Sequence, residues 1–345
     1  VASGSSTFDV ADPAGFSPGD TILITRPVTD AWVAFMGMDR LVRNGRPETW
    51  VKGNILTRRG VTAVSGTAIT VDVPLPDAFD ATYTAPGVTV QKITASGEVS
   101  QVGIENLSIR SGAQSGPITQ KHDQAISIHG ASDGWARHID IYNTVNSISV
   151  TADRITVEDI RIFHELPTVG AAKPADINGS GSQLLFSRCH ITGDNLFYFA
   201  TGAKVSGPIV LLDCVFQGNG WIQPHQRWAT GFLVDSSEVP EGGIDLMNRG
   251  GMGSGHGWAM GWGVAWNNVA KSYLIQMPPG AANWSIGNRG EQVLAKMPRY
   301  SPGPPLPMLP QGIVESQGQP VVPASLYLEQ LSDRLGPQAL QNIGY

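Results

Sequence analysis

The sequence predicts an all-β chain whose centre is a single-stranded, right-handed parallel β-helix. Three observations favour this fold. Turn-forming residues are abundant, with 41 Gly and 24 Pro among 345 residues, whereas charged residues make up only 15%. Segments with apolar residues at every second position recur at intervals of about 20 to 50 residues, which indicates a solenoid. These segments lack the 3.6-residue period of helical repeats and the consensus of leucine-rich repeats.

The first part of the chain, residues 1–100, is expected to form a β-rich capping region with one helix. Residues 16–27 have the composition of a strand. Residues 62–75 alternate as a hairpin does, with Ser65 and Gly66 at its turn. An open end of a β-helix is a sheet edge that needs covering, and we expect this region to cover one end.

One helix is expected before the solenoid in the sequence and one after it. The first begins at Asp30, a favourable N-cap, and ends at Gly45. In the last part of the chain, 296–345, a Pro-rich and extended tail over 301–312 leads into a second helix. Its leucines at helical spacing are Leu326, Leu328, Leu331 and Leu335. We expect this helix to dock on the solenoid or to cap it.

Residues 101–295 are expected to form the β-helix itself. Aligning Cys189 with Cys214 gives a step of 25 residues, and Asn268 lies 54 residues further on, close to two more steps. The segments with the shared pattern are GIENLSIR (103–110), RITVEDIRIF (154–163), QLLFSRCHIT (183–192), PIVLLDCVFQ (208–217) and WGVAWNNVAK (262–271). Equivalent positions stack, so the two cysteines are expected to be neighbours, either as buried thiols or as a disulfide.

A second repeat, an aromatic residue followed three positions later by Gly, occurs four times. Its members are FATG (199–202), WATG (228–231), WAMG (258–261) and WSIG (284–287). We expect their aromatic residues to stack in the core at equivalent positions, the alternative being exposed platforms for sugar rings. Trp221 and Trp262 fall outside this register and are predicted to be exposed, substrate-stacking residues.

Composition and missing motifs exclude several kinds of partner. The net charge is -6 and no basic run exceeds two residues, so we expect no nucleic-acid partner. No apolar stretch approaches the ~20 residues that a membrane span needs. The two cysteines fit no metal spacing, and no HExxH, CxxC pair or EF-hand loop is present, so no cofactor is predicted. A Ca²⁺ site built from scattered Asp and Asn residues stays open as an alternative.

Two histidines precede the repeated aromatics and are the strongest candidates for chemistry. His225 comes three residues before one tryptophan and His256 two residues before the next, so both fall in corresponding connections. Function concentrates in such loops. The first connection also contains Gln223 and Arg227, and the second contains Arg249 in a glycine-rich turn. We predict that the histidines and arginines are catalytic and that Gln223 binds substrate.

A third basic group lies nearer the N-terminus. Lys121 and His122 precede the strand AISIHG, in a loop that we expect several coils along the same groove. We predict that they bind substrate, the alternative being a solvated turn.

The combination PHQRWATG, NRGGMGSGHGW, VAWN and PPGAANWSIG is similar to a signature of secreted, pectin-lyase-like proteins of no assigned activity. Over roughly residues 100–290 the chain resembles the pectate-lyase-like superfamily of right-handed parallel β-helix proteins. The resemblance implies a carbohydrate-active protein that is secreted or periplasmic. The chain lacks the WIDH-type strand and RxPxxR segment of pectate lyases. Of the NTD, DD, GHG and RIK motifs of polygalacturonases it has only Gly255-His256-Gly257.

Three functions follow from these residues. The favoured one is a polysaccharide lyase that cleaves a uronic-acid polymer by β-elimination, with His225 or His256 as base and the arginines neutralising the uronate. A glycoside hydrolase is the second and needs two carboxylates, for which Asp194 and Asp235 are nearest in sequence. The third is a non-catalytic, carbohydrate-binding or adhesive β-helix. The oligomeric state is left open.

Overall fold

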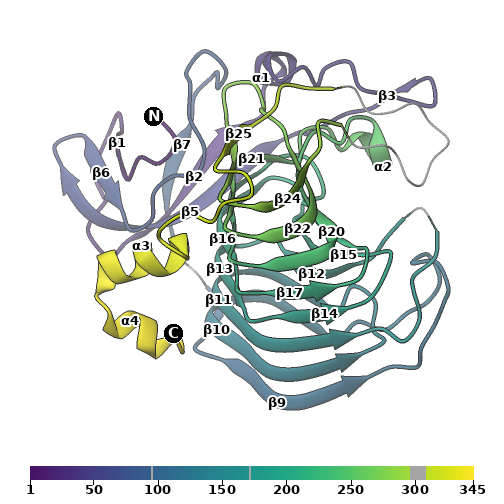
Figure 1. The fold of residues 1–345 in the computed structure, drawn as a ribbon. Helices are drawn as coiled ribbons and strands as arrows, with labels where there is room; N and C mark the ends of the chain where they lie inside the picture. The colour runs from purple at the N-terminus through teal and green to yellow at the C-terminus, as the bar shows by residue number, and fades with distance from the viewer. Residues whose placement is uncertain (95, 171, 296–307) are drawn as a thin grey trace.

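A computed structural model describes residues 1–94, 96–170, 172–295 and 308–345. Its centre is a solenoid of parallel strands that rises from β9 (Gly103–Arg110) toward β24 (Arg289–Gln292) and β25 (Ile313–Glu315). Each coil passes through three stacks of strands in turn, and the chain rises with a right-handed sense (Figure 1). The predicted right-handed parallel β-helix is therefore confirmed.

Strands of successive coils pair in register and form the three stacks. The first stack contains the initial parts of β10 (Ile126–Tyr142) and β11 (Ile148–Phe163), then β12 (Ala175–Gly179), β15 (Phe197–Ala200), β18 (Trp221–Ile222), and the final parts of β20 (Glu238–Leu246) and β22 (Val269–Ile275). The second contains β8 (Val99–Ser100), parts of β9 to β11, β13 (Ser182–Ser187), β16 (Val205–Leu212), β19 (Ala229–Asp235), β21 (Met260–Trp266), β23 (Asn283–Ile286) and β25. The third contains the ends of β9 to β11, β14 (His190–Thr192), β17 (Val215–Gln217), the starts of β20 and β22, and β24.

The interior of the solenoid is a column of apolar side chains. Alternate residues of each strand point inward, as Ile141, Ile162, Ile191 and Phe216 do at exposures of 2% or less. Their neighbours in sequence point outward and form columns on the outer surface. The register of 25 residues between Leu184 and Ile209 is the one predicted from the cysteine alignment.

The turn between the second and third stacks contains the predicted ladder. Cys189 and Cys214 are free, buried thiols on consecutive coils, which confirms the thiol alternative. The Ser237 amide donates to the Asn268 side chain at 2.8 Å, and the Asn268 amide donates to Asn288 at 2.7 Å. Buried side-chain amides thus satisfy the backbone in a turn that water does not reach.

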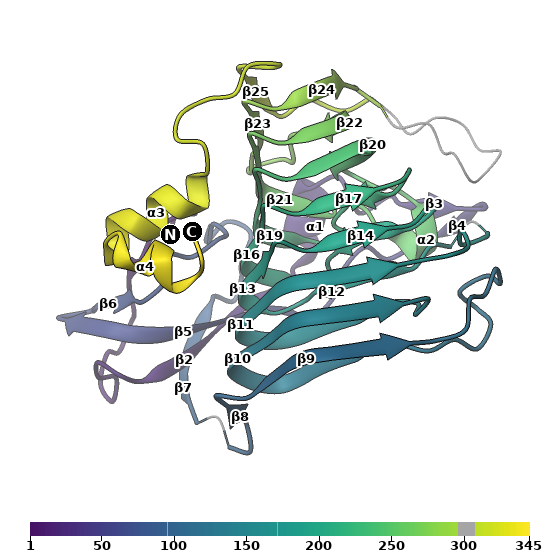
Figure 2. The same cartoon turned by 60° about the horizontal axis from the view of Figure 1, so that its bottom comes forward.

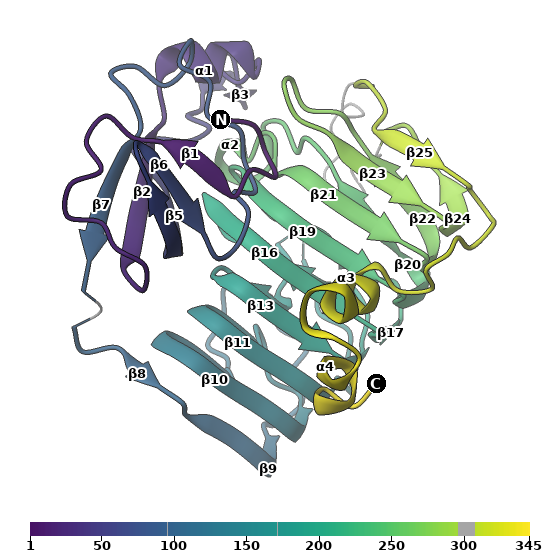
Figure 3. The same ribbon diagram turned by 90° about the vertical axis from the view of Figure 1, so that its left-hand side faces the viewer.

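The N-terminal region forms an antiparallel sheet that lies against the side of the solenoid (Figures 2 and 3). Its strands, in sheet order, are β1 (Thr7–Asp9), β6 (Ala68–Val71), β5 (Asn54–Ser65), β2 (Thr21–Pro27) and β7 (Thr89–Ile93). The expected strand at 16–27 and the hairpin at Ser65-Gly66 are both present. From β5, the buried Arg59 donates to Ser182 at 3.1 Å and to the Gly207 carbonyl at 2.8 Å, which fixes the sheet against the second stack.

The predicted helix from Asp30 to Gly45 is much shorter in the structure. Helix α1 spans Asp30–Phe35, and its N-cap is Thr29, whose hydroxyl accepts from the Trp32 amide. Gly37, at a φ of 67°, ends the helix. The following residues form a hairpin of β3 (Val42–Arg43) and β4 (Arg46–Pro47), because Gly45 supplies a hairpin turn and not a helix end.

The C-terminal helix is present as predicted, at Leu326–Leu335 (α3), and is followed by α4 (Gln338–Asn342). Figure 3 shows both helices in front of the second stack, where Tyr327 and Leu328 pack against outward residues of β13 and β16. The helix therefore docks on the side of the solenoid. Of the predicted Pro-rich tail at 301–312, residues 301–307 lie outside the described residues.

Candidate active site

The two predicted connections lie side by side where the chain passes from the first stack to the second. One follows β18 and the other follows β20 and includes the short turn α2 (Met252–Gly255). The Arg227 amide donates to the His256 carbonyl at 3.0 Å, and the Trp228 amide donates to the Trp258 carbonyl at 2.9 Å. Backbone pairing thus brings residues about 30 positions apart in sequence into contact.

Three predicted catalytic side chains meet there and are called the His–Arg cluster: His225, Arg249 and His256. Arg249 Nη1 lies 3.0 Å from His225 Nδ1 and donates to the His225 carbonyl oxygen at 2.9 Å. The two imidazole rings lie 4.7 Å apart between centroids. Phe197 closes one side, with its ring 5.4 Å from that of His225 and 5.3 Å from the Arg249 guanidinium.

The hydrogen bond to Arg249 fixes the proton on His225. Arginine has no acceptor, so His225 Nδ1 must accept, and the proton of the neutral ring sits on Nε2. Burial, together with the charges of Arg249 and His256, lowers the pKa of His225 to about 2. Burial and the charges of Arg249, Arg227 and Arg43 lower the pKa of His256 to about 3. Both histidines are therefore neutral at pH 7.

Arg249 is the buried positive charge of the cluster. Burial lowers its pKa to about 10, and nearby Asp245 opposes that shift. Asp245, 2% exposed, accepts a hydrogen bond from the predicted substrate-binding residue Gln223, itself 2% exposed. Asp245 was not predicted, although the alternation in GGIDL places it on the outer face beside Gln223.

The fourth predicted residue, Arg227, lies at the edge of the cluster. Its Nη2 donates to the Ser254 carbonyl at 2.6 Å and to the Ser254 hydroxyl at 2.7 Å, so it fastens one connection to the next. Like His225, it is half-buried and keeps part of its surface in contact with solvent. The structure places Arg227 beside the cluster but aims its guanidinium at Ser254.

Unpaired polar atoms concentrate at this place. Among the described residues, four buried side-chain atoms at this place have no hydrogen-bond partner in the protein: Arg227 Nε, Arg249 Nε, His256 Nδ1 and Thr201 Oγ1. The Thr201 carbonyl accepts from the His225 amide, so it belongs to the same turn. Buried polar groups are normally paired, and a group of unpaired ones indicates a place that binds water or ligand.

The N-terminal region clamps both connections. Trp32 and Trp50 pack edge-on against Trp228, with ring centroids 5.7 and 6.1 Å away. Trp50 Nε1 donates to the Trp258 carbonyl at 3.1 Å, and Trp258 Nε1 donates to the Met36 carbonyl at 3.2 Å. Figure 1 shows α2 beside β3 at this contact. The clamp thus covers Trp228 and Trp258, which follow His225 and His256 in the two connections.

The backbone beside His225 is strained. Arg227 and Trp228 have φ values of 55° and 67°, which non-glycine residues seldom adopt. Asp77 holds this conformation by accepting from Trp228 Nε1 at 2.8 Å. Positive φ values also occur at other turns of the solenoid, such as those at Arg188 and Asp213, so this backbone does not by itself mark a functional site.

The predicted aromatic ladder is wrong in register. Phe199 pairs with Ile222 in the first stack, whereas Trp228 lies outside the solenoid core, under the clamp. In the pairing between the two connections, Trp258 is one residue out of register with Trp228. Trp284 pairs with Val264 and not with an aromatic residue of the predicted ladder. The connections differ in length, so equal spacing in sequence does not give equal position. Phe199, Trp228 and Trp258 are nevertheless buried, as the structural interpretation requires.

The two tryptophans predicted to be exposed are not open platforms. Trp221 is 4% exposed and packs with Phe197 on the outer face of the first stack, with the Lys173 ammonium 5.7 Å from its ring. Trp262 is half-buried in β21, and its Nε1 lies 3.3 Å from Asp77 as a donor. Trp221 lies on the first stack, two residues before Gln223 in the chain, whereas Trp262 lies on the second stack.

The remaining sequence candidates do not join the cluster. Lys121 and His122 precede β10, so they lie four strand steps from β18 along the first stack, on the order of 20 Å away. Asp194 accepts from the Asn219 amide in a turn after the third stack. Asp235 is buried under α3, where it accepts from Ser325 and the Tyr327 amide. The predicted pair of hydrolase carboxylates is therefore not assembled here.

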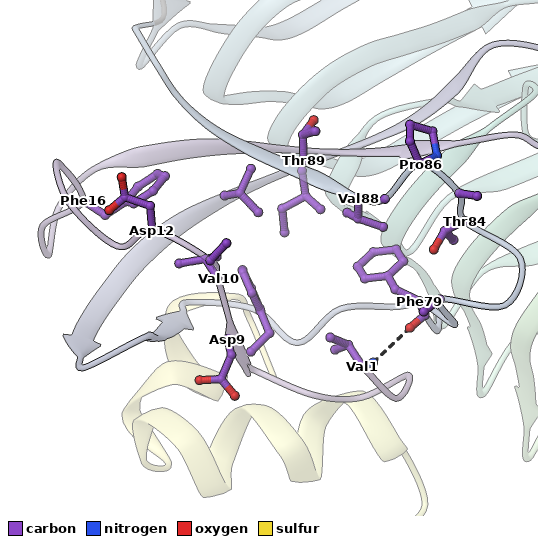
Figure 4. A pocket seen from close by; sticks show the side chains of 17 residues that line it. Val1, Asp9, Val10, Asp12, Phe16, Phe79, Thr84, Pro86, Val88 and Thr89 are labelled. Atoms are coloured by element: carbon purple, nitrogen blue, oxygen red, sulfur yellow. Dashed lines mark hydrogen bonds between the residues drawn. The ribbon is translucent and has the colours of Figure 1, made fainter.

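A cavity of about 630 Å³ lies elsewhere, in the N-terminal sheet (Figure 4). Phe8, Phe16, Phe79 and Val88 line it, and Asp9 lies at its side.

In the described part of the chain, no group of three or more His, Cys, Asp and Glu residues is placed to hold a metal ion. No helix among the described residues is long and apolar enough to cross a membrane.

Comparisons with known proteins find similarity in structure and not in sequence. No protein family model matches the chain, and no curated protein matches it. Three similar solved structures are the gp54 tailspike of Acinetobacter baumannii bacteriophage AP22 in complex with A. baumannii capsular saccharide, the tailspike gp61 of Pseudomonas phage phi297 and the tailspike gp49 of Pseudomonas phage LKA1. Their sequence identities are 12%, 10% and 12%, and their TM-scores are 0.38, 0.30 and 0.29.

These alignments cover 91%, 84% and 85% of this chain but only 60%, 60% and 57% of the tailspike chains. At such low identity and TM-score they carry no argument about function. The fold of this chain rests on its own parallel strand ladders.

Proposed function

We propose that the protein is a polysaccharide lyase that cleaves a uronic-acid-containing polymer by β-elimination at the His–Arg cluster. The observation that carries the proposal is the buried Arg249 guanidinium held against the neutral His225, with the His256 ring 4.7 Å from that of His225. A cation of this kind neutralises a uronate carboxylate and so makes the proton on the neighbouring carbon easier to remove. Such polymers lie outside the cytoplasm, so the proposal includes a secreted or periplasmic protein.

The two histidines take different roles in this proposal. His256 has a nitrogen, Nδ1, without a partner among the described residues and acts as the base that takes the C5 proton. His225 carries its proton on Nε2 and donates a hydrogen bond to the leaving oxygen. The C4–O bond breaks, a C4–C5 double bond forms, and His256 delivers its proton to the leaving oxygen. The step consumes no water and returns both rings to the neutral state.

Substrate binding offsets part of the low basicity of His256. Burial is the main cause of its pKa near 3, and the charge of Arg249 adds to it. A substrate carboxylate beside Arg249 offsets that charge and so favours the protonated ring. Neutral sugars bring no such charge, so the proposal predicts activity on uronate polymers and none on dextran.

The cluster favours elimination over hydrolysis. Inverting and retaining glycosidases need two carboxylates about 5–9.5 Å apart across the bond. Among the described residues, Asp245 lies beside the cluster and is hydrogen-bonded to Gln223, whereas the predicted pair Asp194 and Asp235 lies elsewhere. A non-catalytic, carbohydrate-binding solenoid is the remaining alternative.

The reaction type is tested by the product. Polygalacturonate, alginate, hyaluronate and dextran are incubated with the protein, with and without EDTA, and absorbance near 235 nm is followed beside reducing ends. The proposal predicts new reducing ends together with 235-nm absorbance on at least one uronate polymer. Reducing ends without absorbance would indicate hydrolysis, and no product on any of a wider set of uronate polymers would leave binding as the function.

The histidine roles are tested by His256→Gln, which removes the base, with His138→Asn as the matched control. His138 is exposed and has a φ of 55°, a conformation that Asn tolerates. His256→Gln is expected to lower the elimination rate at least about 100-fold, the usual contribution of a positioned base. The control is expected to retain the wild-type rate.

A further inference from the structure

A second surface with the chemistry of a sugar-binding site lies on the outer face of the third stack. A cavity of about 340 Å³ opens there, formed by consecutive strands β10, β11 and β14. Its outward side chains are Asp140, Tyr142, Arg161, Phe163, His190 and Thr192. It is separate from the His–Arg cluster, which lies beyond the first stack and at later coils.

The strand register arranges these side chains in two columns parallel to the axis of the solenoid. One column pairs Asp140 with Arg161 and Arg161 with His190. The other pairs Tyr142 with Phe163 and Phe163 with Thr192. Consecutive rungs are ~4.8 Å apart, so a linear polymer lying along the axis meets a new pair of side chains at each coil. Figure 2 shows the ends of these strands stacked one above another.

The aromatic column is open to solvent in a way that core packing does not explain. Phe163 is 41% exposed, and its ring lies 6.3 Å from that of the half-buried Tyr142 in an edge-on arrangement. The residues just before them in each strand, Ile141 and Ile162, point inward and already fill the core. An exposed aromatic face flanked by polar groups favours the apolar face of a sugar ring.

The charges of this surface favour an anionic chain. Arg161 has a side-chain exposure of 76%, and its contact with Asp140 is long, at 3.8 Å. Arg110 of the preceding coil, on β9, extends the same face, with its guanidinium 3.7 Å from the Tyr142 ring. Two arginines and His190 thus face one carboxylate, in a protein with a net charge of -6. A loosely paired, exposed Arg161 is available to a sugar carboxylate.

We infer that the columns Asp140–Arg161–His190 and Tyr142–Phe163–Thr192 form a non-catalytic binding surface for a linear anionic polysaccharide. The chain lies along the solenoid axis, with a sugar ring on Phe163 and a carboxylate at Arg161. This inference is independent of the proposed reaction, because the surface contains none of the residues of the His–Arg cluster. A second binding surface increases the time that the protein stays on a long polymer without changing cleavage of a short one.

The test measures binding and not product. Retardation of the full chain in native gels containing polygalacturonate, alginate or hyaluronate is compared with retardation in dextran, all in the His256→Gln background. Phe163→Ser and Arg161→Gln are compared with matched changes on other faces, Phe35→Ser and Arg40→Gln, at positions 39% and 92% exposed. We expect at least fivefold weaker binding to a uronate polymer for the two surface variants and unchanged binding for the controls.

Two results would overturn the inference: no retardation of the His256→Gln parent by any of the three polymers, or retardation of Phe163→Ser and Arg161→Gln that equals that of the parent. Retention of binding in His256→Gln together with loss in Phe163→Ser would support it even if no elimination product forms. The surface is therefore judged separately from the proposed lyase activity.

Discussion

The connections that follow the first stack and the outer face of the third stack carry similar residues in opposite settings. The connections hold His225, Arg249 and His256 beside the N-terminal clamp, with exposures of 7% for Arg249 and His256. The third stack holds Arg161 and His190 in the open. Burial shifts the pKa values of the first group strongly. In our proposals the setting of each group, buried or open, and not the repeat, separates the residues assigned to chemistry from those assigned to binding.

The largest difference between the two faces is expected in stability. Trp228→Ala removes a buried side chain that packs with Trp32 and Trp50 and is expected to cost about 3–5 kcal/mol. Phe163→Ser on the open face is expected to change stability by no more than about 0.5 kcal/mol. Urea unfolding followed by tryptophan fluorescence and by circular dichroism measures both. Similar losses for the two variants would remove the distinction between clamp and open face.

A smaller effect is expected in the pH dependence of stability. The pKa values of His225 and His256 are about 2 and about 3 in the folded chain, below the 6.5 of an ordinary histidine. Between those values the unfolded chain binds more protons, so stability is full above about pH 6.5 and falls as the pH drops toward 3. His256→Gln is expected to lower by about one the number of protons that the chain takes up on unfolding in this pH range.

The measurement is the urea midpoint from pH 7.5 to pH 4, with His138→Asn as control. An equal slope in wild type and His256→Gln would mean that folding does not lower the pKa of His256, which contradicts a buried ring that stays neutral well below pH 6.5.

The smallest effect concerns salt. Arg161 and Asp140 form an exposed, long pair, and such pairs contribute about 0–1 kcal/mol. Raising the salt concentration from 0.05 to about 0.5 M is therefore expected to leave the stability of Arg161→Gln and wild type equal within error, while polymer retardation by wild type weakens. A strong effect of salt on the wild-type stability alone would show that Arg161 is a structural residue.

The sequence predicts the solenoid well because its signal is local and repeated. Alternating apolar residues such as Leu184 and Ile209 recur at the step that strand pairing then adopts. The C-terminal helix follows from leucine spacing in the same way. The aromatic ladder fails because the turns after β15, β18 and β20 differ in length, so Phe199 and Trp228 share a motif but not a stack.

The meeting of His225, Arg249 and His256 follows from their corresponding connections, but their burial does not. Trp32 and Trp50, which pack on Trp228 and Trp258 beside the cluster, come nearly 200 residues earlier, and no local pattern relates them to the turn. The same long-range packing takes Trp228 out of the core and gives Trp262 a partner in Asp77. Contacts between the N-terminal region and the solenoid are thus the part of the site that sequence periodicity cannot supply.

The most direct test of the assignment is the initial rate of 235-nm absorbance for Arg249→Gln on the best uronate polymer at pH 7. Arg40→Gln, at an exposed arginine, is the matched control. Circular dichroism and the urea midpoint first establish that both variants are folded. Loss of a preorganised charge is expected to lower the rate about 10²–10³-fold for Arg249→Gln and to leave Arg40→Gln unchanged. Equal rates for wild type and a folded Arg249→Gln would contradict a reaction centre at the His–Arg cluster.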